Sequence, residues 1–354
     1  MGLPEIVIDL EKIKSNVRTV RALADPLGIE VVGVTKGVLG DVRIAEAFLA
    51  GGITTLGDSR WENLQRLRQA FPDVSLMLLR IPGLSQIERV IRWADISLNS
   101  DLEVLQALSE EALRCNKQHK VILMVDLGDL REGVWPQDLP ELTKRARLLP
   151  GIRIIGLGAN FACYGGLIPT VEKVKQLVEL ADAMEGILGY SLAVISGGNS
   201  ANLPLVLNQT IPQRINQLRL GEGILQGTES IQRRLLPGSV PDAFVLRAEI
   251  IERYEKPTLP LGETGQDAFG KLPKFTDEGW RKRGILALGR QDVPLEGLML
   301  RDQRLRIFGA SSDHLIVDLT EAGELALGSI VEFNLSYGGL LGAMTSPYVE
   351  KRYV

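Results

Sequence analysis

The stretch Val31-Val32-Gly33-Val34-Thr35-Lys36-Gly37-Val38 predicts a buried strand that ends on a lysine followed by a glycine. Four valines in eight residues are typical of a strand covered on both faces, as in a parallel sheet. The carboxyl ends of such strands form the edge at which ligands bind. A lysine held there among apolar groups has a lowered pKa, as a Schiff-base nucleophile requires, although an arbitrary strand-end lysine is more often solvated. Lys36 is therefore the first candidate functional residue.

Strand and helix patterns alternate over the first two thirds of the chain. Short apolar runs bounded by turn residues alternate with segments whose apolar residues recur at helical spacing. After the strand that ends at Lys36, we predict strands at 54–56, 74–79, 96–98, 121–125, 152–157, 192–195 and 217–220. The predicted helices lie at 42–49, 60–69, 84–92, 101–113, 138–148 and 170–188. Eight strand–helix units over roughly 200 residues favour a closed parallel barrel of the TIM type over an open sheet.

The character of the sequence changes after about residue 227. β-Rich runs, separated by Gly, Pro and Asp clusters, lie at 244–251, 284–288, 305–307, 315–319 and 330–335. Such runs, without long helical patterns between them, are typical of a small antiparallel domain. We therefore predict an N-terminal strand at 1–10 that joins the C-terminal domain, a (β/α)8 barrel at 11–230, and a mainly antiparallel β domain at 231–354.

The composition is that of an ordinary soluble globular protein. Of the 354 residues, 45% are hydrophobic and 24% are charged, and the net charge of −4 gives no electrostatic reason to expect nucleic acid or a membrane surface as a partner. The apolar runs are too short to cross a bilayer, and residues 1–9 lack the features of a signal peptide. We therefore expect a cytoplasmic protein.

Cysteine and histidine are scarce. Cys115 and Cys163 have no metal-type spacing, so we expect reduced thiols rather than a disulfide. The two histidines are His119, which we expect to be solvated in a polar loop, and His314. They are too few for a histidine-rich zinc site, and we expect no metal.

Glycine-rich motifs follow the last two predicted barrel strands. Gly197-Gly198-Asn199-Ser200 follows one strand, and Gly221-Glu222-Gly223 follows the next. Taken singly, such motifs are typical of turns and helix caps. Barrels, however, commonly bind phosphate in these two loops, where backbone N–H groups favour an anion. A lysine at the end of the first strand, with a phosphate cradle after the last two, is the layout of a pyridoxal-phosphate site in which the lysine holds the aldehyde carbon.

Several segments spread over almost the whole chain match one enzyme family. They read Ile8-Asp9-Leu10-Glu11-Lys12-Ile13, Gly33-Val34-Thr35-Lys36-Gly37-Val38, Leu56-Gly57-Asp58-Ser59-Arg60, Val125-Asp126-Leu127-Gly128-Asp129-Leu130-Arg131-Glu132-Gly133, Gly265-Gln266-Asp267-Ala268-Phe269-Gly270 and Asp313-His314-Leu315-Ile316-Val317-Asp318. On these segments the chain resembles the alanine racemase-type (fold type III) pyridoxal-phosphate enzymes, within the amino-acid racemase branch that includes ornithine racemase. The resemblance implies pyridoxal 5'-phosphate as cofactor and a homodimer with active sites at the subunit interface.

The resemblance also implies roles for single residues. On this basis Lys36 binds the cofactor covalently and is the base on one face of the substrate α-carbon. Arg219 lies against the pyridine nitrogen, where related decarboxylases place a carboxylate. Because an arginine keeps its proton, this arrangement favours proton return over decarboxylation. The other implied cofactor contacts are Ser200, Gly221 and the backbone of Glu222 at the phosphate, Arg131 near the phenolic oxygen and the substrate carboxylate, Asn160 near the ring, and Tyr348, unless it is simply packed, in place of a family tyrosine.

The second acid/base departs from the family pattern. Alanine racemase uses a tyrosine from the other subunit, and the corresponding turn in this chain places Asp267 at that position. In that role desolvation must raise the pKa of Asp267 well above the usual value of about 3.9; the alternative is an aspartate that stabilises a turn. His314 is the other candidate, with a strand-edge histidine as its alternative. Cys163 and Tyr164, at the end of the sixth predicted strand, are weaker candidates.

The function that the resemblance implies is racemisation. Such an enzyme interconverts L- and D-amino acids by proton transfer between two bases. The expected substrate is ornithine or another basic amino acid, lysine included, whose distal amine is held by an acidic group among Asp129, Glu132 and Asp267. Two alternatives stay open. A decarboxylase of basic amino acids is disfavoured by Arg219, and a non-catalytic pyridoxal-phosphate carrier leaves residues 240–354 unexplained.

Overall fold

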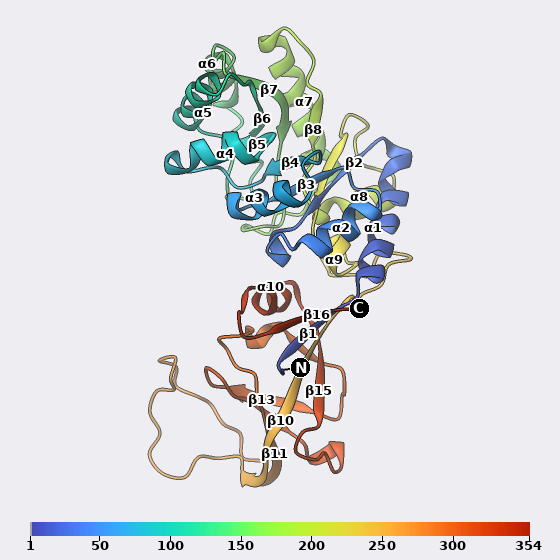
Figure 1. Ribbon diagram of the computed structural model, residues 1–354, viewed down its shortest axis with the longest axis vertical. Coiled ribbons are helices and arrows are strands. Elements are labelled where there is room, and N and C mark those ends of the chain that lie inside the picture. Colours follow the sequence, from blue (N-terminus) through green and yellow to red (C-terminus); the bar gives the residue numbers. More distant parts are fainter. Residues whose placement is uncertain (1) are drawn as a thin grey trace. The chain divides into compact units, whose positions relative to one another are not determined.

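The computed structural model describes residues 2–354, which form two compact units (Figure 1). One unit holds residues 10–241, and the other holds residues 2–9 together with residues 242–354. Met1, which begins the predicted N-terminal strand, lies outside the described residues. The chain therefore passes from the smaller unit into the larger one and back again.

The second change of unit falls between Pro241 and Asp242, beyond the predicted boundary at 230. The segment 231–241 belongs to the larger unit because Asn16 holds it. The side-chain amide of Asn16 donates to Val240 O at 2.8 Å and accepts from Val240 N at 2.7 Å. A long-range hydrogen bond of this kind cannot be read from local composition. The sequence therefore changes from helical to β-rich patterns before the chain leaves the larger unit.

The larger unit is a closed barrel of eight parallel strands with helices around it (Figure 1). Its strands are β2 (Glu30–Val34), β3 (Thr55–Asp58), β4 (Ser75–Leu78), β5 (Ile96–Asn99), β6 (His119–Met124), β7 (Ile152–Gly158), β8 (Val194–Ser196) and β9 (Gln217–Leu220). β2 pairs with both β3 and β9, and Val32 lies opposite Arg219. Closure thus makes the first and last barrel strands neighbours. Val32, Met77, Leu98 and Met124 pack in one buried cluster.

The helices of this unit alternate with its strands, and several begin at a capping side chain. They are α1 (Leu10–Ala24), α2 (Val42–Ala50), α3 (Trp61–Ala70), α4 (Ile87–Trp93), α5 (Leu102–Arg114), α6 (Leu139–Ala146), α7 (Val171–Leu188), α8 (Leu203–Leu207) and α9 (Glu222–Leu225). The 3-10 turns are η1 (Asp25–Leu27), η2 (Lys36–Val38), η3 (Leu84–Gln86) and η4 (Ser200–Asn202). Asp101 caps α5 by accepting from Glu103 N at 2.8 Å, and Thr170 caps α7 by accepting from Lys173 N at 3.2 Å. Within residues 2–354, none of the helices is long and apolar enough to cross a membrane.

The smaller unit is built on a mainly antiparallel sheet. Its elements are β1 (Glu5–Ile8), β10 (Phe244–Pro257), β11 (Trp280–Leu286), η5 (Leu295–Gly297), β12 (Leu298–Leu300), β13 (Arg306–Ala310), β14 (Leu315–Asp318), η6 (Thr320–Ala322), β15 (Ile330–Leu335), α10 (Tyr337–Thr345) and β16 (Glu350–Tyr353). The strand order is β12-β15-β10-β11-β14-β13, and β1 pairs with β10 and β16. Alternate residues of β10, namely Leu246, Ala248 and Ile250, are fully buried, as expected for a strand with one face on a core.

Two local predictions are wrong. The strand predicted to end on Lys36 ends at Val34, because Thr35 adopts helical backbone and Lys36 begins η2. His119 is not solvated: it begins β6, is 5% exposed, and its Nε2 lies 2.8 Å from Ser97 Oγ. Burial lowers the pKa of His119 to about 4, so its ring is neutral at neutral pH.

Candidate active site

Lys36 lies at the end of the barrel where the carboxyl ends of the strands meet. η2 carries it directly after β2, and the preceding Thr35 anchors the turn by donating its N–H to Gly57 O on β3 at 2.9 Å. Burial is the main cause that lowers the pKa of Lys36. The side chains whose charges act on it are Cys163, Arg131, Glu132 and Asp58. A lowered pKa leaves more of the amine neutral, which is the form that attacks a carbonyl carbon or accepts a proton.

Asp58, at the end of β3, is a fully buried carboxyl group beside the Lys36 turn. It accepts hydrogen bonds from Thr35 Oγ1 at 2.7 Å, from Asn63 Nδ2 at 3.0 Å and from Arg60 N at 3.0 Å. Burial raises the pKa of Asp58. Asp58 has no predicted role, although an acidic residue at the end of the strand that follows the lysine strand is a signal visible in the sequence. Asp58 is a positioning residue for the turn that carries Lys36.

Arg219 is buried inside the barrel on β9, the neighbour of the strand that precedes Lys36. Its Nη2 donates to Ala159 O at 2.7 Å and to Asn160 Oδ1 at 2.9 Å, and its Nη1 donates to Ser196 Oγ. Burial lowers the pKa of Arg219 to about 10, which still leaves the guanidinium charged at neutral pH. This cation is therefore held in one orientation by its acceptors.

Glu132 pairs directly with Arg131 and is linked to Arg219 through Asn160. Asn160, which accepts from Arg219, donates its Nδ2 to Glu132 Oε1 at 2.5 Å. The same carboxylate pairs with the guanidinium of Arg131. Three of the predicted cofactor residues are thus brought into one hydrogen-bonded chain. Glu132 is predicted only as a candidate partner for the substrate amine, and the structure adds this linking role.

Asp129, the second acidic candidate of the same loop, organises the segment after β7. Its carboxylate accepts the backbone N–H groups of Cys163 at 3.0 Å, Tyr164 at 3.1 Å and Leu167 at 3.1 Å. The side chain is buried, and these bonds occupy both of its oxygens. Asp129 therefore fixes the loop and is a poor partner for a substrate ammonium group.

The predicted phosphate contacts lie after β8 and β9. Ser200 begins η4, and its Oγ accepts from Gly223 N at 3.0 Å, which joins the two loops. Gly221 directly precedes α9. The carboxylate of Glu222 pairs with Arg233 at 2.7 Å. The side chain of Glu222 is thus engaged, and its backbone stays the predicted anion contact.

Two observations fit a phosphate-bearing cofactor at these loops. Asn202, in the same turn as Ser200, is fully buried, and neither its Nδ2 nor its Oδ1 has a hydrogen-bond partner among residues 2–354. A buried amide costs free energy unless some group supplies partners. Gly198 has a φ of +126°, and a Cβ at this position would lie 2.5 Å from Asn202 Nδ2. The glycine keeps this space open, so the residues present fit pyridoxal phosphate.

Asp267 belongs to the smaller unit, where it stabilises an exposed turn. Its Oδ1 accepts from Phe269 N and from Lys271 N, each at 2.9 Å. These backbone bonds, the one from Lys271 first, hold the pKa of Asp267 below its usual value. Asp267 is exposed, so burial does not raise its pKa as the role of a second acid/base requires. Its local structure is that of the alternative prediction, an aspartate that stabilises a turn.

The last two predicted site residues, His314 and Tyr348, also belong to the smaller unit. His314 is exposed, and its Nδ1 lies 2.9 Å from Asp313 Oδ1. Tyr348 is 66% exposed, so it is not a packed side chain. Neither residue has a contact that identifies a role, and both stay predictions.

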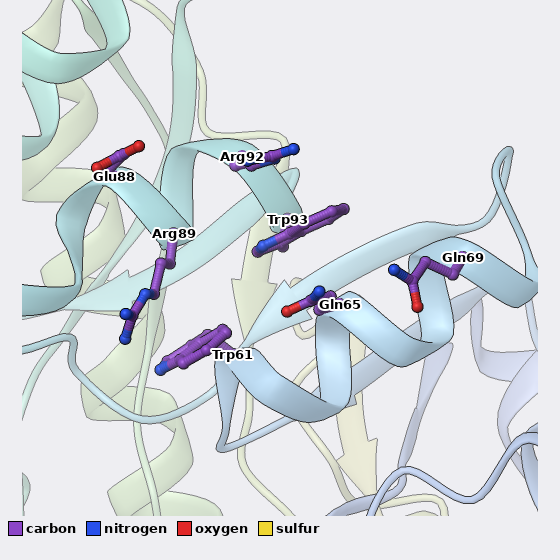
Figure 2. Close-up of a pocket in the computed structure, with 7 residues that line it drawn as sticks. All are labelled: Trp61, Gln65, Gln69, Glu88, Arg89, Arg92 and Trp93. Atoms are coloured by element: carbon purple, nitrogen blue, oxygen red, sulfur yellow. The ribbon is translucent and has the colours of Figure 1, made fainter.

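A separate pocket lies between α3 and α4, on the outside of the barrel (Figure 2). Its lining residues are Trp61, Gln65, Gln69, Glu88, Arg89, Arg92 and Trp93. The guanidinium carbon of Arg89 lies 4.3 Å from the centre of the Trp61 ring, and that of Arg92 lies 4.8 Å from the centre of the Trp93 ring. These cation–π pairs account for the side-chain arrangement, and the pocket shares no residue with the candidate site.

The arrangement around Lys36 defines a class of protein. A closed parallel barrel with a half-buried lysine after its first strand, a buried arginine on its last strand and an antiparallel β unit is the architecture of the alanine racemase fold. Residues 8–228 match the family model described as alanine racemase, N-terminal domain. The chain belongs to this family.

Curated relatives and solved structures agree with this assignment. The chain is 41% identical over 353 residues to lysine racemase of Thermotoga maritima, covering 100% of this chain and 99% of the relative. It is 41% identical over 350 residues to ornithine racemase of Acetoanaerobium sticklandii, covering 98% and 99% of the two chains. Alanine racemase from Streptomyces lavendulae has the same fold, with a TM-score of 0.78, 20% identity and coverage of 100% and 98%. The predicted resemblance and fold class are confirmed.

A further solved structure bears on the cofactor. Alanine racemase from Bartonella henselae, with covalently bound pyridoxal phosphate, matches with a TM-score of 0.77 and 18% identity, covering 100% of both chains. At this identity the likeness concerns the fold, and the fit of the cofactor to this chain rests on the residues described above.

Proposed function

We propose that this protein is a pyridoxal-phosphate-dependent racemase of basic amino acids, with ornithine or lysine as substrate. The observation that carries the proposal is the half-buried Lys36, whose pKa is lowered by burial, directly after the strand that pairs with β9, which carries the buried and hydrogen-bonded guanidinium of Arg219. The identity of 41% to proteins named lysine racemase and ornithine racemase supports the reaction and the substrate class.

The cofactor contacts follow from the residues that the barrel brings together. Lys36 would bind the aldehyde carbon, and Ser200, Gly221 and the backbone of Glu222 would bind the phosphate. The ring contacts would be Arg131, Asn160 and Arg219. When bound, pyridoxal phosphate supplies an electron sink for the charge that remains on the α-carbon after its proton leaves. Arg219 keeps its own proton and so leaves the pyridine nitrogen unprotonated, which favours return of a proton over loss of carbon dioxide.

Proton transfer needs one group on each face of the substrate α-carbon. Lys36 serves one face, because its lowered pKa provides a neutral amine that accepts the α-proton. Asp267 and His314 are the candidates that the family pattern suggests for the other face, contributed by the partner in a homodimer with active sites at the interface. Their exposure leaves both accessible to a second chain.

The distal amine of a basic substrate requires an acidic partner. Of the three candidates, Asp129 is fully engaged by backbone N–H groups. Glu132 and Asp267 therefore carry this part of the proposal. The free thiols of Cys115 and Cys163 fit a reducing compartment such as the cytoplasm, where we place the protein.

The test is deuterium incorporation at the α-carbon in heavy water, measured across a panel of amino acids with added pyridoxal phosphate. We expect exchange and change of configuration with ornithine and lysine, and loss of both in Lys36→Ala. Release of carbon dioxide in place of exchange would establish the decarboxylase alternative. Cofactor binding without exchange on any amino acid would establish the carrier alternative.

A further inference from the structure

A row of hydrogen bonds runs inside the barrel from Arg219 toward the end opposite Lys36. Ser196 Oγ, which accepts from Arg219 Nη1, donates to Gln217 Oε1 at 3.0 Å. Gln217 Nε2 donates to Glu30 Oε2 at 2.9 Å. Glu30 begins β2, Gln217 begins β9, and the two lie opposite each other in the sheet. Arg219, Ser196, Gln217 and Glu30 thus form an interior row that ends on a carboxylate at the amino ends of the strands.

The interior row is closed to solvent except at its last residue. Ser196 is fully buried, and Gln217 is 2% exposed. Glu30 is exposed, but its second carboxylate oxygen, Oε1, accepts from the hydroxyl of the buried Thr55 at 2.7 Å. Both oxygens of Glu30 therefore have donors from neighbouring strands, and the carboxylate is fixed although the residue is open to water.

The carboxylate of Glu30 sets the direction of every bond in the interior row. A carboxylate only accepts hydrogen bonds, so Glu30 faces the NH2 group of the Gln217 side chain. The amide oxygen of Gln217 then faces Ser196 and takes its hydroxyl hydrogen. The lone pairs of that hydroxyl are left for the guanidinium of Arg219, which has donors only. Glu30 thereby favours the one arrangement in which Ser196 holds Arg219.

The charge of Arg219 is balanced through neutral intermediates. Asn160 and Ser196 both accept from its guanidinium, and each leads on to a carboxylate. Asn160 donates to Glu132, in the loop after β6, whereas Ser196 is linked to Glu30. A buried cation is costly without compensation, and hydrogen bonds in series polarise one another and strengthen such a link. The guanidinium is therefore held between two carboxylates, one toward each end of the barrel.

We propose that Glu30 is a positioning residue for Arg219 and acts through Gln217 and Ser196 from the amino ends of the strands. This inference rests on the proposed function, in which Arg219 leaves the pyridine nitrogen unprotonated. The guanidinium has this effect only while its N–H groups keep one orientation. Asn160 fixes one of its two NH2 groups, and the interior row fixes the other. A residue at the far end of the barrel thus bears on which substrate bond breaks.

Exchange of the guanidinium hydrogens tests the interior row without cofactor. Arg219 is the only buried arginine among residues 2–354, and its NMR signals in the full chain with isotope-labelled arginine are assigned by their loss in Arg219→Lys. We expect Glu30→Gln to speed exchange of the Nη hydrogens by about tenfold, the effect of losing one hydrogen bond. An amide at position 30 can donate to Gln217 and reverse the row, which turns the hydroxyl hydrogen of Ser196 toward the cation. Glu110→Gln, at an exposed glutamate of α5, should exchange as the wild type does.

A second substitution shows whether the effect of Glu30 passes through the row. Ser196→Ala removes the link next to Arg219 and should itself speed exchange. Glu30→Gln added to Ser196→Ala should then have no further effect, whereas a general loosening of the barrel would add to it. If Ser196→Ala does not fold, Gln217→Met breaks the row one step earlier with nearly the same shape and permits the same comparison. Exchange in Glu30→Gln alone within about twofold of the wild type would overturn the inference, as would a full effect of about tenfold on either background.

The loaded enzyme provides a second readout, the ratio of carbon dioxide released to ornithine racemised. We expect Glu30→Gln to raise this ratio in the same direction as Arg219→Gln but by less, with KM within about twofold of the wild type. A ratio that rises in Arg219→Gln and not in Glu30→Gln would overturn the inference and leave the racemase function standing. If the wild type exchanges no α-hydrogen, the proposed function fails, while guanidinium exchange still decides whether Glu30 positions Arg219.

Discussion

Thr35 donates a hydrogen bond of 2.7 Å from its hydroxyl to the buried carboxyl group of Asp58, and the next residue in the chain is Lys36. The bond ties the turn after β2 to the end of β3. The position of the reactive amine therefore depends on a residue of the neighbouring strand that has no chemistry of its own in the proposed reaction.

Replacing this carboxyl group should destabilise the fold. Asp58→Ala leaves Thr35 Oγ1 and Asn63 Nδ2 without their buried acceptor, and we expect the free energy of unfolding to fall by about 3 kcal/mol. Urea denaturation of the cofactor-free chain measures this change. Asp73→Ala, at an exposed aspartate, is the control and should change stability little. Equal stability of the two variants would show that the Asp58 bonds contribute nothing.

Removing only the charge of Asp58 should shift the pH profile. Asp58→Asn keeps a side-chain acceptor but no longer favours the protonated form of Lys36, so the pKa of Lys36 falls further. The limb of the rate profile that depends on a neutral amine should therefore move to lower pH. The measurement is kcat/KM for racemisation against pH. A shift to higher pH would contradict the assignment of this limb to Lys36.

His119 should make stability depend on pH. Its pKa is about 4 in the fold and 6.5 in an unfolded chain, so between these values the unfolded chain binds a proton that the folded chain does not. Stability should therefore fall as pH drops from 6.5 to 4, by about 3 kcal/mol in all, and this component should level off at lower pH. The difference in unfolding free energy between the wild type and His119→Gln isolates the effect.

Arg219 should control which bond breaks. In Arg219→Gln the neutral amide no longer excludes a proton from the pyridine nitrogen, so the sink for electrons strengthens and decarboxylation becomes competitive. We expect racemisation of ornithine to fall and the ratio of carbon dioxide released to ornithine racemised to rise. Arg214→Gln, at a surface arginine paired with Asp182 and Glu185, is the control. An unchanged ratio would remove Arg219 from this role.

Gly198 should be required for cofactor binding. An alanine there meets Asn202 Nδ2 at 2.5 Å and adopts a φ of +126° that side chains rarely allow. We expect Gly198→Ala to weaken pyridoxal phosphate binding by about tenfold or more, which corresponds to about 1.4 kcal/mol. Titration followed by the absorbance of the bound cofactor measures the loss. Gly186→Ala, in helix α7 with nothing within 4 Å of its Cβ, should bind normally.

Local sequence patterns predicted the barrel well, because apolar periodicity and capping residues act over short distances. The strand at 217–220 has the predicted bounds, and α5 and α7 begin within one residue of the predicted helix starts. Two local predictions, the end of the Lys36 strand and the exposure of His119, were wrong for different reasons. The strand predicted to end on Lys36 was too long because the run of valines does not show that the backbone turns at Thr35. His119 was predicted to be solvated because its hydrogen-bond partner, Ser97, lies on another strand.

The sequence by itself determined the family, the fold class and the lysine, since each depends on residues that are adjacent or regularly spaced in the chain. Only the tertiary structure decided which charged groups meet. Barrel closure places β9 beside β2 and brings Arg219, Glu132 and Cys163 to the same end as Lys36. The same closure removes water from that amine, and desolvation, which lowers its pKa, is a property of the folded surroundings rather than of any segment.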